Sequence, residues 1–301
     1  MKAIKFATAL IAAGLFFNTA QAQESATLKK IKASGSITLG VRESSVPFTY
    51  LDDKQNYQGY SLDLCMKVVS AIQKQLHLSQ LAVKLNPVTS ATRIPLMANG
   101  TIDLECGSTT NNAERQQQVA FAPSMFLTAT RLLSKKSSHI NGLADLKGKI
   151  LVSTSGTANL KELTALNAER NLGITIVPAK DHAEAFLMVE TGRAAAFGMD
   201  DVLLASLAAS SKTPAAYMIS QESLIPEPYG IMMRRGDPEF KKLVDAEISR
   251  IYTSGEINRI YAKWFQSPIP PKGINLNWPM TEQLKNAFKN PTDSPNPAAY
   301  K

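Results

Sequence analysis

The chain has 301 residues, of which 44% are apolar and 19% charged, so it can bury the core of one large domain or of two medium ones. Moderate glycine and proline contents, 16 of each, and only two cysteines exclude a collagen-like, a disordered and a disulfide-dense chain. The formal net charge is +8 at pH 7, but the basic residues are scattered and no aromatic residues are interleaved with them. We therefore expect no nucleic-acid-binding surface.

Residues 1–22 have the pattern of a secretory signal peptide. Lys2 and Lys5 precede an apolar run over residues 6–17, and the small-residue motif Ala20-Gln21-Ala22 follows it. The alternative, a membrane anchor, needs about 20 apolar residues, and this run is shorter. The mature chain should begin near Gln23 and lie in an oxidising compartment. It has no cysteine at the cleavage point for lipid attachment, and loss of the two lysines reduces its net charge from +8 to +6.

Helix and strand patterns alternate in two series, which predicts two α/β lobes with largely parallel sheets rather than a solenoid. The first series has helices at 27–33, 59–76 and 90–100, with strands at 36–42, 81–88 and 101–107. The second has strands at 125–134, 149–156, 173–179 and 194–200, with helices at 159–170, 181–192 and 201–211. A strand at 229–235 and two helices ending at residue 265 follow, and the polar, proline-rich residues 291–301 are predicted to be disordered.

Cationic side chains lie near the starts of several predicted helices, where the helix dipole disfavours them. Ser90 is the expected N-cap of one helix, yet Arg93 stands where a capping box would have an acid. Arg115 and His182 occupy the first turns of two more. Helix starts that combine hydroxyls with cations suggest anion-binding sites if they converge. The hydroxyl residues concerned are Ser108, Thr109, Thr110 and Thr157.

Each of these residues also has a purely structural interpretation. Arg93 could be an exposed helix residue, Glu114 could offset Arg115, and His182 could be a surface or core histidine.

Two predicted strands also end in charged residues, since Arg42 closes the first strand and Asp200 closes a later one. The carboxyl ends of strands face the ligand crevice in open α/β sheets. Several anion donors together with one cation acceptor describe the recognition of an acidic amino acid.

Enzymatic motifs are missing from the sequence: it has no GxSxG, HExxH, CxxC or GxxxxGK pattern, and its three histidines are scattered. We therefore expect no metal site and no cofactor. Cys65 and Cys106 form either one disulfide or two buried free thiols. A helix starting at Gly59 could pack on the strand at 101–107, which favours the disulfide.

Several longer segments match a known family. They are GYSLDL from Gly59, TIDLECGSTTNNAERQQQVAFAP from Thr101, LADLKGK, SGT, TGRAAAFGMDD and KWF, with the narrower VRESSVPFTY, TSATRIPL, ECGSTTNNAER and AKDH. From about Leu28 to Phe288 the chain resembles the periplasmic solute-binding proteins of ABC transporters, family 3, and its narrower motifs resemble the members that bind glutamate and aspartate.

The resemblance implies a type II periplasmic-binding-protein fold, an α/β fold of two lobes with the ligand in the interlobe cleft. The segments MFLTATRLL and PYGIMM would be its two crossovers. One lobe would then comprise residues 23–127 and 225–290, and the other residues 128–224.

By the same resemblance, the site residues divide into three groups. Ser108, Thr110 and Arg115 would hold the ligand α-carboxylate, Asp200 the ammonium, and Arg42, Ser90, Arg93 and His182 the side-chain carboxylate. Ala158 departs from the family, where a second threonine follows SGT, so that Thr157 would have to supply a cleft hydrogen bond. Cys65 departs as well, and the family therefore gives no support for the disulfide.

The implied function is capture of L-glutamate, L-aspartate or both in the periplasm and delivery to an ABC-type permease of the inner membrane, without catalysis and as a monomer. The alternative is an enzyme, since similar lobes also form cyclohexadienyl dehydratases. That reaction needs a neutral acid in the pocket, and the sequence pattern of three arginines and one aspartate offers none.

Overall fold

The computed structural model describes residues 25–300, and the signal-peptide prediction over 1–22 lies outside them. Its α-helices are α1 Ala26–Ser34, α2 Tyr60–Gln75, α3 Arg93–Ala98, α4 Ala113–Gln116, α5 Ala158–Glu169, α6 His182–Glu190, α7 Asp201–Ser210, α8 Pro238–Thr253, α9 Glu256–Phe265 and α10 Glu282–Lys289. Its strands are β1 Ser36–Val41, β2 Ser44–Ser45, β3 Thr49–Leu51, β4 Tyr57–Gln58, β5 Ala82–Pro87, β6 Leu104–Glu105, β7 Val119–Phe121, β8 Phe126–Lys135, β9 Ile150–Thr154, β10 Thr175–Ala179, β11 Ala196–Asp200, β12 Tyr217–Ile219, β13 Pro226–Tyr229 and β14 Met232–Arg234. Short 3₁₀ helices occupy Lys136–Ser138, Leu143–Leu146, Pro214–Ala216 and, as η4, Pro297–Tyr300.

The first sheet has the strand order β5-β1-β6-β14-β7. Strands β5 and β6 run parallel to β1, whereas β14 is antiparallel to β6 and β7. Strand β14 comes from far along the chain, so the sheet joins residues before 122 with residues after 231. Helix α2 packs on β1 through apolar residues at helical spacing, among them Leu64, Val68 and Ile72, which are fully buried.

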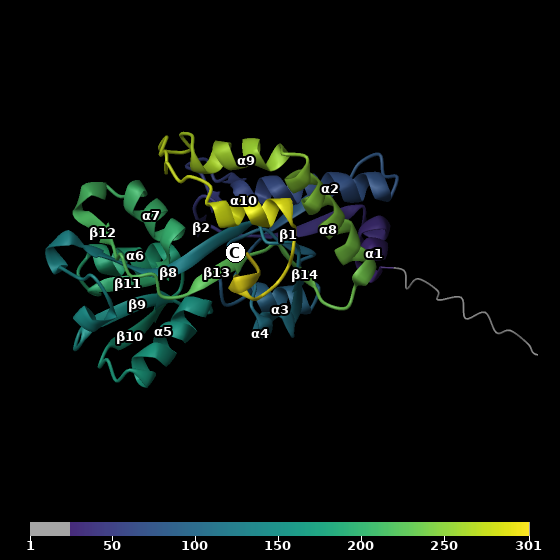
Figure 1. Ribbon diagram of the computed structural model, residues 1–301. Coiled ribbons are helices and arrows are strands. Elements are labelled where there is room, and N and C mark those ends of the chain that lie inside the picture. The colour runs from purple at the N-terminus through teal and green to yellow at the C-terminus, as the bar shows by residue number, and fades with distance from the viewer. Residues whose placement is uncertain (1–24, 301) are drawn as a thin grey trace, which may run out of the picture.

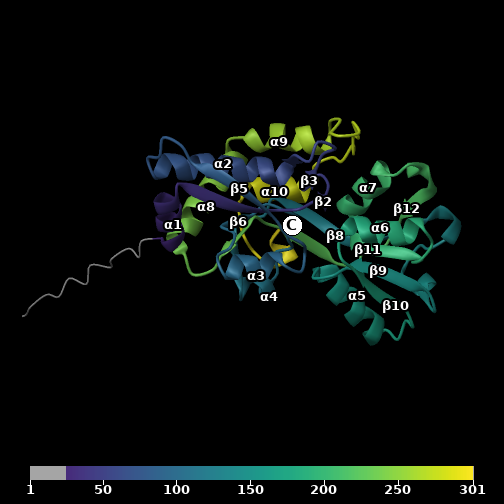
Figure 2. The ribbon, with the colours of Figure 1, turned by 180° about the vertical axis from the view of Figure 1, so that it is seen from behind.

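The second sheet has the order β10-β9-β11-β8-β12 and forms the other half of the molecule. Strands β9, β10 and β11 are parallel, and β8 is antiparallel to β11 and β12. The first half of β8 pairs antiparallel with β13, and these two strands run between the two groups of elements (Figures 1 and 2). The two lobes and the two crossovers of the predicted fold are therefore present.

Both connecting strands are anchored to the first half by aromatic rings. Phe126 at the start of β8 stacks on Phe265, with ring centroids 5.0 Å apart. Tyr229 at the end of β13 meets Phe48 edge to face at 5.2 Å. All four rings are buried. Because such pairs add stabilisation beyond their buried area, this cluster fixes the crossover at one end.

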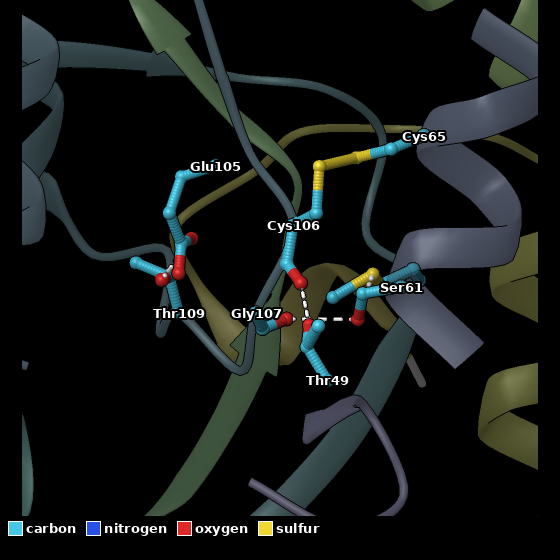
Figure 3. The surroundings of a disulfide bond; sticks show 8 residues. Thr49, Ser61, Cys65, Glu105, Cys106, Gly107 and Thr109 are labelled. Carbon is cyan, nitrogen blue, oxygen red and sulfur yellow. Dashed lines mark hydrogen bonds between the residues drawn. A yellow bond between two sulfur atoms is a disulfide. The ribbon is translucent and has the colours of Figure 1, made fainter. Parts of the chain in front are cut away.

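A disulfide joins Cys65 of α2 to Cys106, which directly follows β6 (Figure 3). On the same loop, the carbonyl oxygen of Gly107 accepts a hydrogen bond of 2.8 Å from Ser61 Oγ, and Thr49 Oγ1 donates to the carbonyl oxygen of Cys106. These contacts fix the loop after β6 against α2. The loop carries several of the site residues described below.

The predicted disorder of residues 291–301 is wrong for 291–300. Tyr300 is buried, and its hydroxyl lies 2.7 Å from Ser124 Oγ. Ser124 N donates to the carbonyl oxygen of Thr292, and Asn111 Nδ2 donates to that of Asp293. The proline-rich composition suggested a segment without apolar anchors, but one tyrosine and backbone carbonyls bonded to the first half hold it in place. Element η4 thereby packs against β13.

Between residues 25 and 300, none of the helices combines the length and the apolar character needed to cross a membrane.

Candidate functional site

The nine residues selected from the sequence come together between the two sheets. Seven of them line a small enclosed space, and Arg42 and Arg115 bond to members of its lining. Ser90, Arg93, Ser108 and Thr110 line it from the side of the first sheet, and Thr157, His182 and Asp200 from the side of the second. Asn159, Met199 and Leu203 complete the lining.

Arg42 follows β1 directly, at the carboxyl end of a central strand. Its Nη2 donates to Ser90 Oγ at 2.9 Å and lies 3.4 Å from Nε2 of His182. His182 is the first residue of α6, and its Nδ1 lies 2.8 Å from Thr154 Oγ1. A guanidinium of the first half therefore reaches an imidazole of the second.

Arg93 lies in α3 and is buried on the first-sheet side. Its Nη1 donates to the carbonyl oxygen of Ser108 at 3.0 Å and to Thr109 Oγ1 at 2.6 Å. The same nitrogen is 4.0 Å from Oε1 of Glu105, a fully buried carboxylate that also accepts from Thr109 (Figure 3). Glu105 thus balances part of the arginine charge.

Arg115 lies in α4 and reaches across to the second half. Its Nη1 donates to the carbonyl oxygen of Thr110 at 2.9 Å, and its Nη2 donates to that of Gly156 at 3.2 Å. Gly156 has a φ of +75°, and an added Cβ would lie 2.5 Å from the Cα of Ala91. Only glycine allows this turn and the close approach of the two backbones.

Asp200 ends β11 and is the carboxylate of the lining. Its Oδ1 accepts a 2.8 Å hydrogen bond from Asn159 Nδ2, and its Oδ2 accepts from the Tyr229 hydroxyl. Asn159 comes from α5 and Tyr229 from the connecting strand β13. The carboxylate is therefore oriented by one residue of the second half and one of the crossover.

Burial and the charges of neighbouring arginines lower the pKa values of Arg42, Arg115 and His182. Burial, then the Arg93 charge, lowers the pKa of Arg42 to about 9 and that of Arg115 to about 10. Burial, then Arg42 and Arg93, holds the pKa of His182 well below its ordinary value, so its imidazole is neutral. An anion placed among these groups would reverse the repulsion.

Three buried polar atoms of the site have no hydrogen-bond partner among residues 25–300: Arg42 Nη1, Arg93 Nε and Ser108 Oγ. Two of them are charged donors. Because a buried donor without a partner is costly, a site that retains two such donors is suited to an anionic acceptor.

The reasoning that located the cations needs one correction. Ser90 is not an N-cap, because α3 begins at Arg93 after Thr92, and Ser90 Oγ accepts from Arg42 instead. Asn112 caps α4, which spans only four residues. Neither short helix provides an N-terminal anion site, so these arginines act through their own guanidinium groups. Asp181, in contrast, does cap α6.

Thr157 lines the enclosed space, but its hydroxyl is engaged locally. It donates to the carbonyl oxygen of Thr154 at 2.6 Å and accepts from Leu160 N as the N-cap of α5. Ala158, the departure from the family pattern, is the first residue of α5 and is buried. The Thr157 side chain therefore has little capacity left to replace a second threonine.

Sequence reasoning missed four polar residues of the site region: Glu105, Asn159, Glu227 and Tyr229. All four are buried, and no spacing pattern marks any of them as a site residue. For Glu227 the available signal was a single acid between two prolines, Pro226 and Pro228. They orient the predicted residues through tertiary contacts.

Glu227 also belongs to a cluster of acids. Burial, then Asp200 and Glu162, raises the pKa of Glu227 well above its ordinary value. Burial, then Asp200, likewise raises the pKa of Glu162 in α5. A buried carboxyl that holds its proton to higher pH than an exposed glutamate does therefore lies next to the site.

In the part of the chain that the structure describes, no group of three or more His, Cys, Asp or Glu side chains is arranged to hold a metal ion.

Comparisons with known proteins agree on one family. The model of the bacterial extracellular solute-binding proteins, family 3, matches residues 37–267. A Pseudomonas aeruginosa protein named L-glutamate/L-aspartate-binding protein is 52% identical over 287 residues, 95% of each chain. An Escherichia coli K12 protein named glutamate/aspartate import solute-binding protein is 47% identical over 298 residues, 97% of this chain and 99% of the other.

Solved structures show the same two-lobed fold. A variant of the T. maritima arginine-binding protein superposes with a TM-score of 0.71 at 25% identity, over 80% of this chain and 99% of the other. An ancestral amino-acid-binding protein described as a precursor of cyclohexadienyl dehydratase has a TM-score of 0.67, also at 25% identity, over 79% and 98%.

Proposed function

The chain belongs to the bacterial extracellular solute-binding proteins, family 3, and from that premise we propose that its buried site captures L-glutamate and L-aspartate for import. The observation that carries the proposal is the charge arrangement. Buried Arg93 and buried Asp200 line a single enclosed space between the two sheets, and two further buried arginines, Arg42 and Arg115, bond to its lining. Such an arrangement complements two carboxylates and one ammonium. The names of relatives at 47–52% identity support the same ligands.

The proposed ligand groups follow from where the side chains lie. The side-chain carboxylate of the ligand is received by Arg42, Arg93, Ser90 and the neutral His182. The unpartnered Arg42 Nη1 and Arg93 Nε can donate to it. Arg115, with Ser108 and Thr110, receives the α-carboxylate. Asp200, held by Asn159 and Tyr229, receives the ammonium.

Capture requires the two halves to close around the ligand. We assign residues 23–127 and 225–290 to one lobe, to which residues 291–300 attach, and residues 128–224 to the other. Strands β8 and β13 connect the lobes. Contacts that cross the cleft include those from Arg42 to His182 and from Arg115 to Gly156. A ligand that binds the arginines of the first lobe and Asp200 of the second at the same time would favour the closed arrangement, because both sets of contacts form only when the lobes meet.

A calorimetric titration of refolded, ligand-free protein tests the proposal. Glutamate and aspartate should bind, and glutamine and asparagine should not, because an amide leaves the charges of Arg42 and Arg93 buried with only Glu105 to balance them. A ligand at 100 times its Kd should stabilise the fold by about 2.7 kcal/mol, visible as a rise in Tm. Glutamine that raises the Tm as strongly as glutamate would refute the specificity.

A dehydratase activity is the second candidate, and Glu227 is the observation that favours it. The argument against this activity was the lack of a neutral acid, and the raised pKa of Glu227 makes it a candidate for such an acid near the site. Glu227 is separated from the enclosed space by Thr110, to which it is bonded. We therefore propose that the protein is not an enzyme. Formation of an aromatic product from arogenate or prephenate would reverse this assignment.

Location and partners complete the proposal. The protein acts in the periplasm after removal of residues 1–22 and delivers its ligand to the permease subunits of an ABC transporter as a monomer, without a cofactor. Sequencing of the mature N-terminus, sizing of the purified protein, and uptake of labelled glutamate in cells with and without the chain test these three statements separately.

A further inference from the structure

Glu227 occupies an unusual place in the molecule. It lies in the connecting strand β13, opposite Thr128 of β8, with only 3% of its surface exposed. Its Oε2 lies 3.0 Å from the Thr110 hydroxyl. Its Oε1 has no hydrogen-bond partner among the residues that the structure describes. A carboxyl on the hinge therefore touches a hydroxyl that lines the ligand space.

The charges around Glu227 are mostly negative. Asp200 at the end of β11 and Glu162 of α5 are the acids that act on it. Arg115 of α4 is the nearby cation, and it is already bonded to the carbonyl oxygens of Thr110 and Gly156. The other ionisable groups near β13 are Tyr229 on β13 itself, Asp201 at the start of α7, Arg131 of β8 and Tyr300 of η4. Arg131 pairs with Asp201 at 3.7 Å, and Tyr300 bonds to Ser124.

The protonation state of Glu227 decides what Thr110 can offer a ligand, because a threonine hydroxyl has one hydrogen. An ionised Glu227 can only accept, so it takes that hydrogen, and Thr110 then presents lone pairs to the enclosed space. A protonated Glu227 can donate to Thr110 Oγ1. Thr110 is then free to donate its own hydrogen to a carboxylate.

We propose that Glu227 is a positioning residue that is protonated when the ligand is bound. Its carboxyl group donates to Thr110, and Thr110 donates to the ligand α-carboxylate. Capture of the ligand is thereby coupled to the uptake of one proton at the hinge. This inference rests on the proposed function, since it takes an amino acid as the ligand. It extends that function to a dependence on pH. Burial and the two neighbouring acids, which raise the pKa of Glu227, support it.

The variant that tests the coupling is Glu227→Gln, whose amide donates to Thr110 at every pH. In the unmodified protein, Kd for glutamate should rise up to tenfold per pH unit above the pKa of Glu227, because one proton must be taken up. In E227Q, Kd should stay near the low-pH value throughout. Titrations in two buffers of different ionisation enthalpy should show proton uptake in the unmodified protein and none in E227Q.

Glu162→Gln is the matched control, because Glu162 belongs to the same acid cluster without a bond to Thr110. It should keep the rise in Kd but shift it to lower pH, since one repelling charge is removed. An E227Q protein whose Kd varies with pH as in the unmodified protein would overturn the proposal. Failure of the unmodified protein to bind any amino acid would instead refute the proposed function.

A ligand-free measurement keeps the two failures apart. A carboxyl whose pKa is raised on folding stabilises the native state at low pH, and this stabilisation is lost as pH rises through the folded-state pKa. The Tm of the unmodified protein should therefore fall more steeply than that of E227Q as pH rises from mildly acidic to neutral. Identical slopes would show that Glu227 carries no proton and would overturn the proposal without reference to a ligand.

Discussion

Nη2 of Arg42 lies 3.4 Å from Nε2 of His182, although the two residues belong to opposite halves of the molecule. A guanidinium only donates hydrogen bonds, so Nε2 must accept. The remaining ring hydrogen then lies on Nδ1, which is 2.8 Å from Thr154 Oγ1. The neutral state that burial and two arginine charges impose on His182 is thus the state that this geometry requires.

A neutral His182 has a consequence for stability. Its pKa is lowered on folding, so the unfolded chain takes up a proton near the ordinary pKa of about 6.5 while the native chain does not. The free energy of unfolding of the ligand-free protein should therefore fall below about pH 6.5, with about 1.4 kcal/mol per pH unit from this residue. Urea unfolding across this range measures the slope. His182→Asn should remove that component, and an equal slope in both proteins would contradict the assignment.

The disulfide should stabilise both the fold and the site. Cys65 and Cys106 are 41 residues apart in sequence, and closing a loop of that size contributes roughly 4 kcal/mol in the chain-entropy model. Reduction or the double substitution Cys65→Ala and Cys106→Ala should lower the free energy of unfolding by that order. Glutamate affinity should also fall, since the loop after Cys106 holds Arg93 through Ser108. Two thiols that alkylate in the denatured, unreduced protein would show that the bond is not formed.

The sequence indicated which charged residues lie near the site, but not all of the local structures that place them there. Arg42 and Asp200 were found because they end strands, and the geometry of parallel sheets places strand ends at one edge. Arg93 and Arg115 were found through helix starts that proved too short to act as anion sites. Both are buried beside the enclosed space, and the signal that selected them, an arginine in a hydroxyl-rich segment, does not depend on the local structure.

The residues that orient the site could not be found in this way. Glu105 and Glu227 are buried in strands, where an acid has no periodic signature, and each acts through a contact more than three residues away, with Thr109 and Thr110 respectively. Likewise, nothing local to Tyr300 indicates that Ser124 lies beside it. Only the tertiary arrangement creates these partners.

The exposed ion pair across the cleft should contribute little. Lys161 of α5 and Glu114 of α4 are paired, but their side chains are 67% and 59% exposed. Pairs of this kind contribute about 0.2–1 kcal/mol and are screened by salt. Lys161→Met should therefore raise the Kd for glutamate by less than about fivefold, an effect that disappears at high ionic strength. Arg115→Met, which removes a buried cation beside it, should raise Kd far more, and similar effects for both variants would contradict this ranking.

Asp200 should make this an amino-acid site rather than a site for any dicarboxylate. Glutarate and succinate carry the two carboxylates of the proposed ligands but no ammonium, so they would leave the buried Asp200 charge unpaired and facing negative groups. Asp200→Asn keeps the side-chain volume and the contact with Asn159 while removing that charge. Glutamate affinity should fall by about 3–5 kcal/mol in this variant, whereas glutarate affinity should stay the same or rise.

Asp201→Asn is the matched control for that substitution, since Asp201 is adjacent in sequence but bonds to Thr128 and does not line the enclosed space. It should leave the ratio of glutamate to glutarate affinity unchanged. Calorimetric titration of both ligands into the three proteins measures the ratios. Equal losses of glutamate and glutarate affinity in Asp200→Asn would mean that Asp200 only maintains the shape of the site. A charge that recognises ammonium must discriminate between a ligand with an ammonium group and a ligand without one. Tight glutarate binding by the unmodified protein would contradict the role directly, since the repulsion from Asp200 acts before any substitution is made.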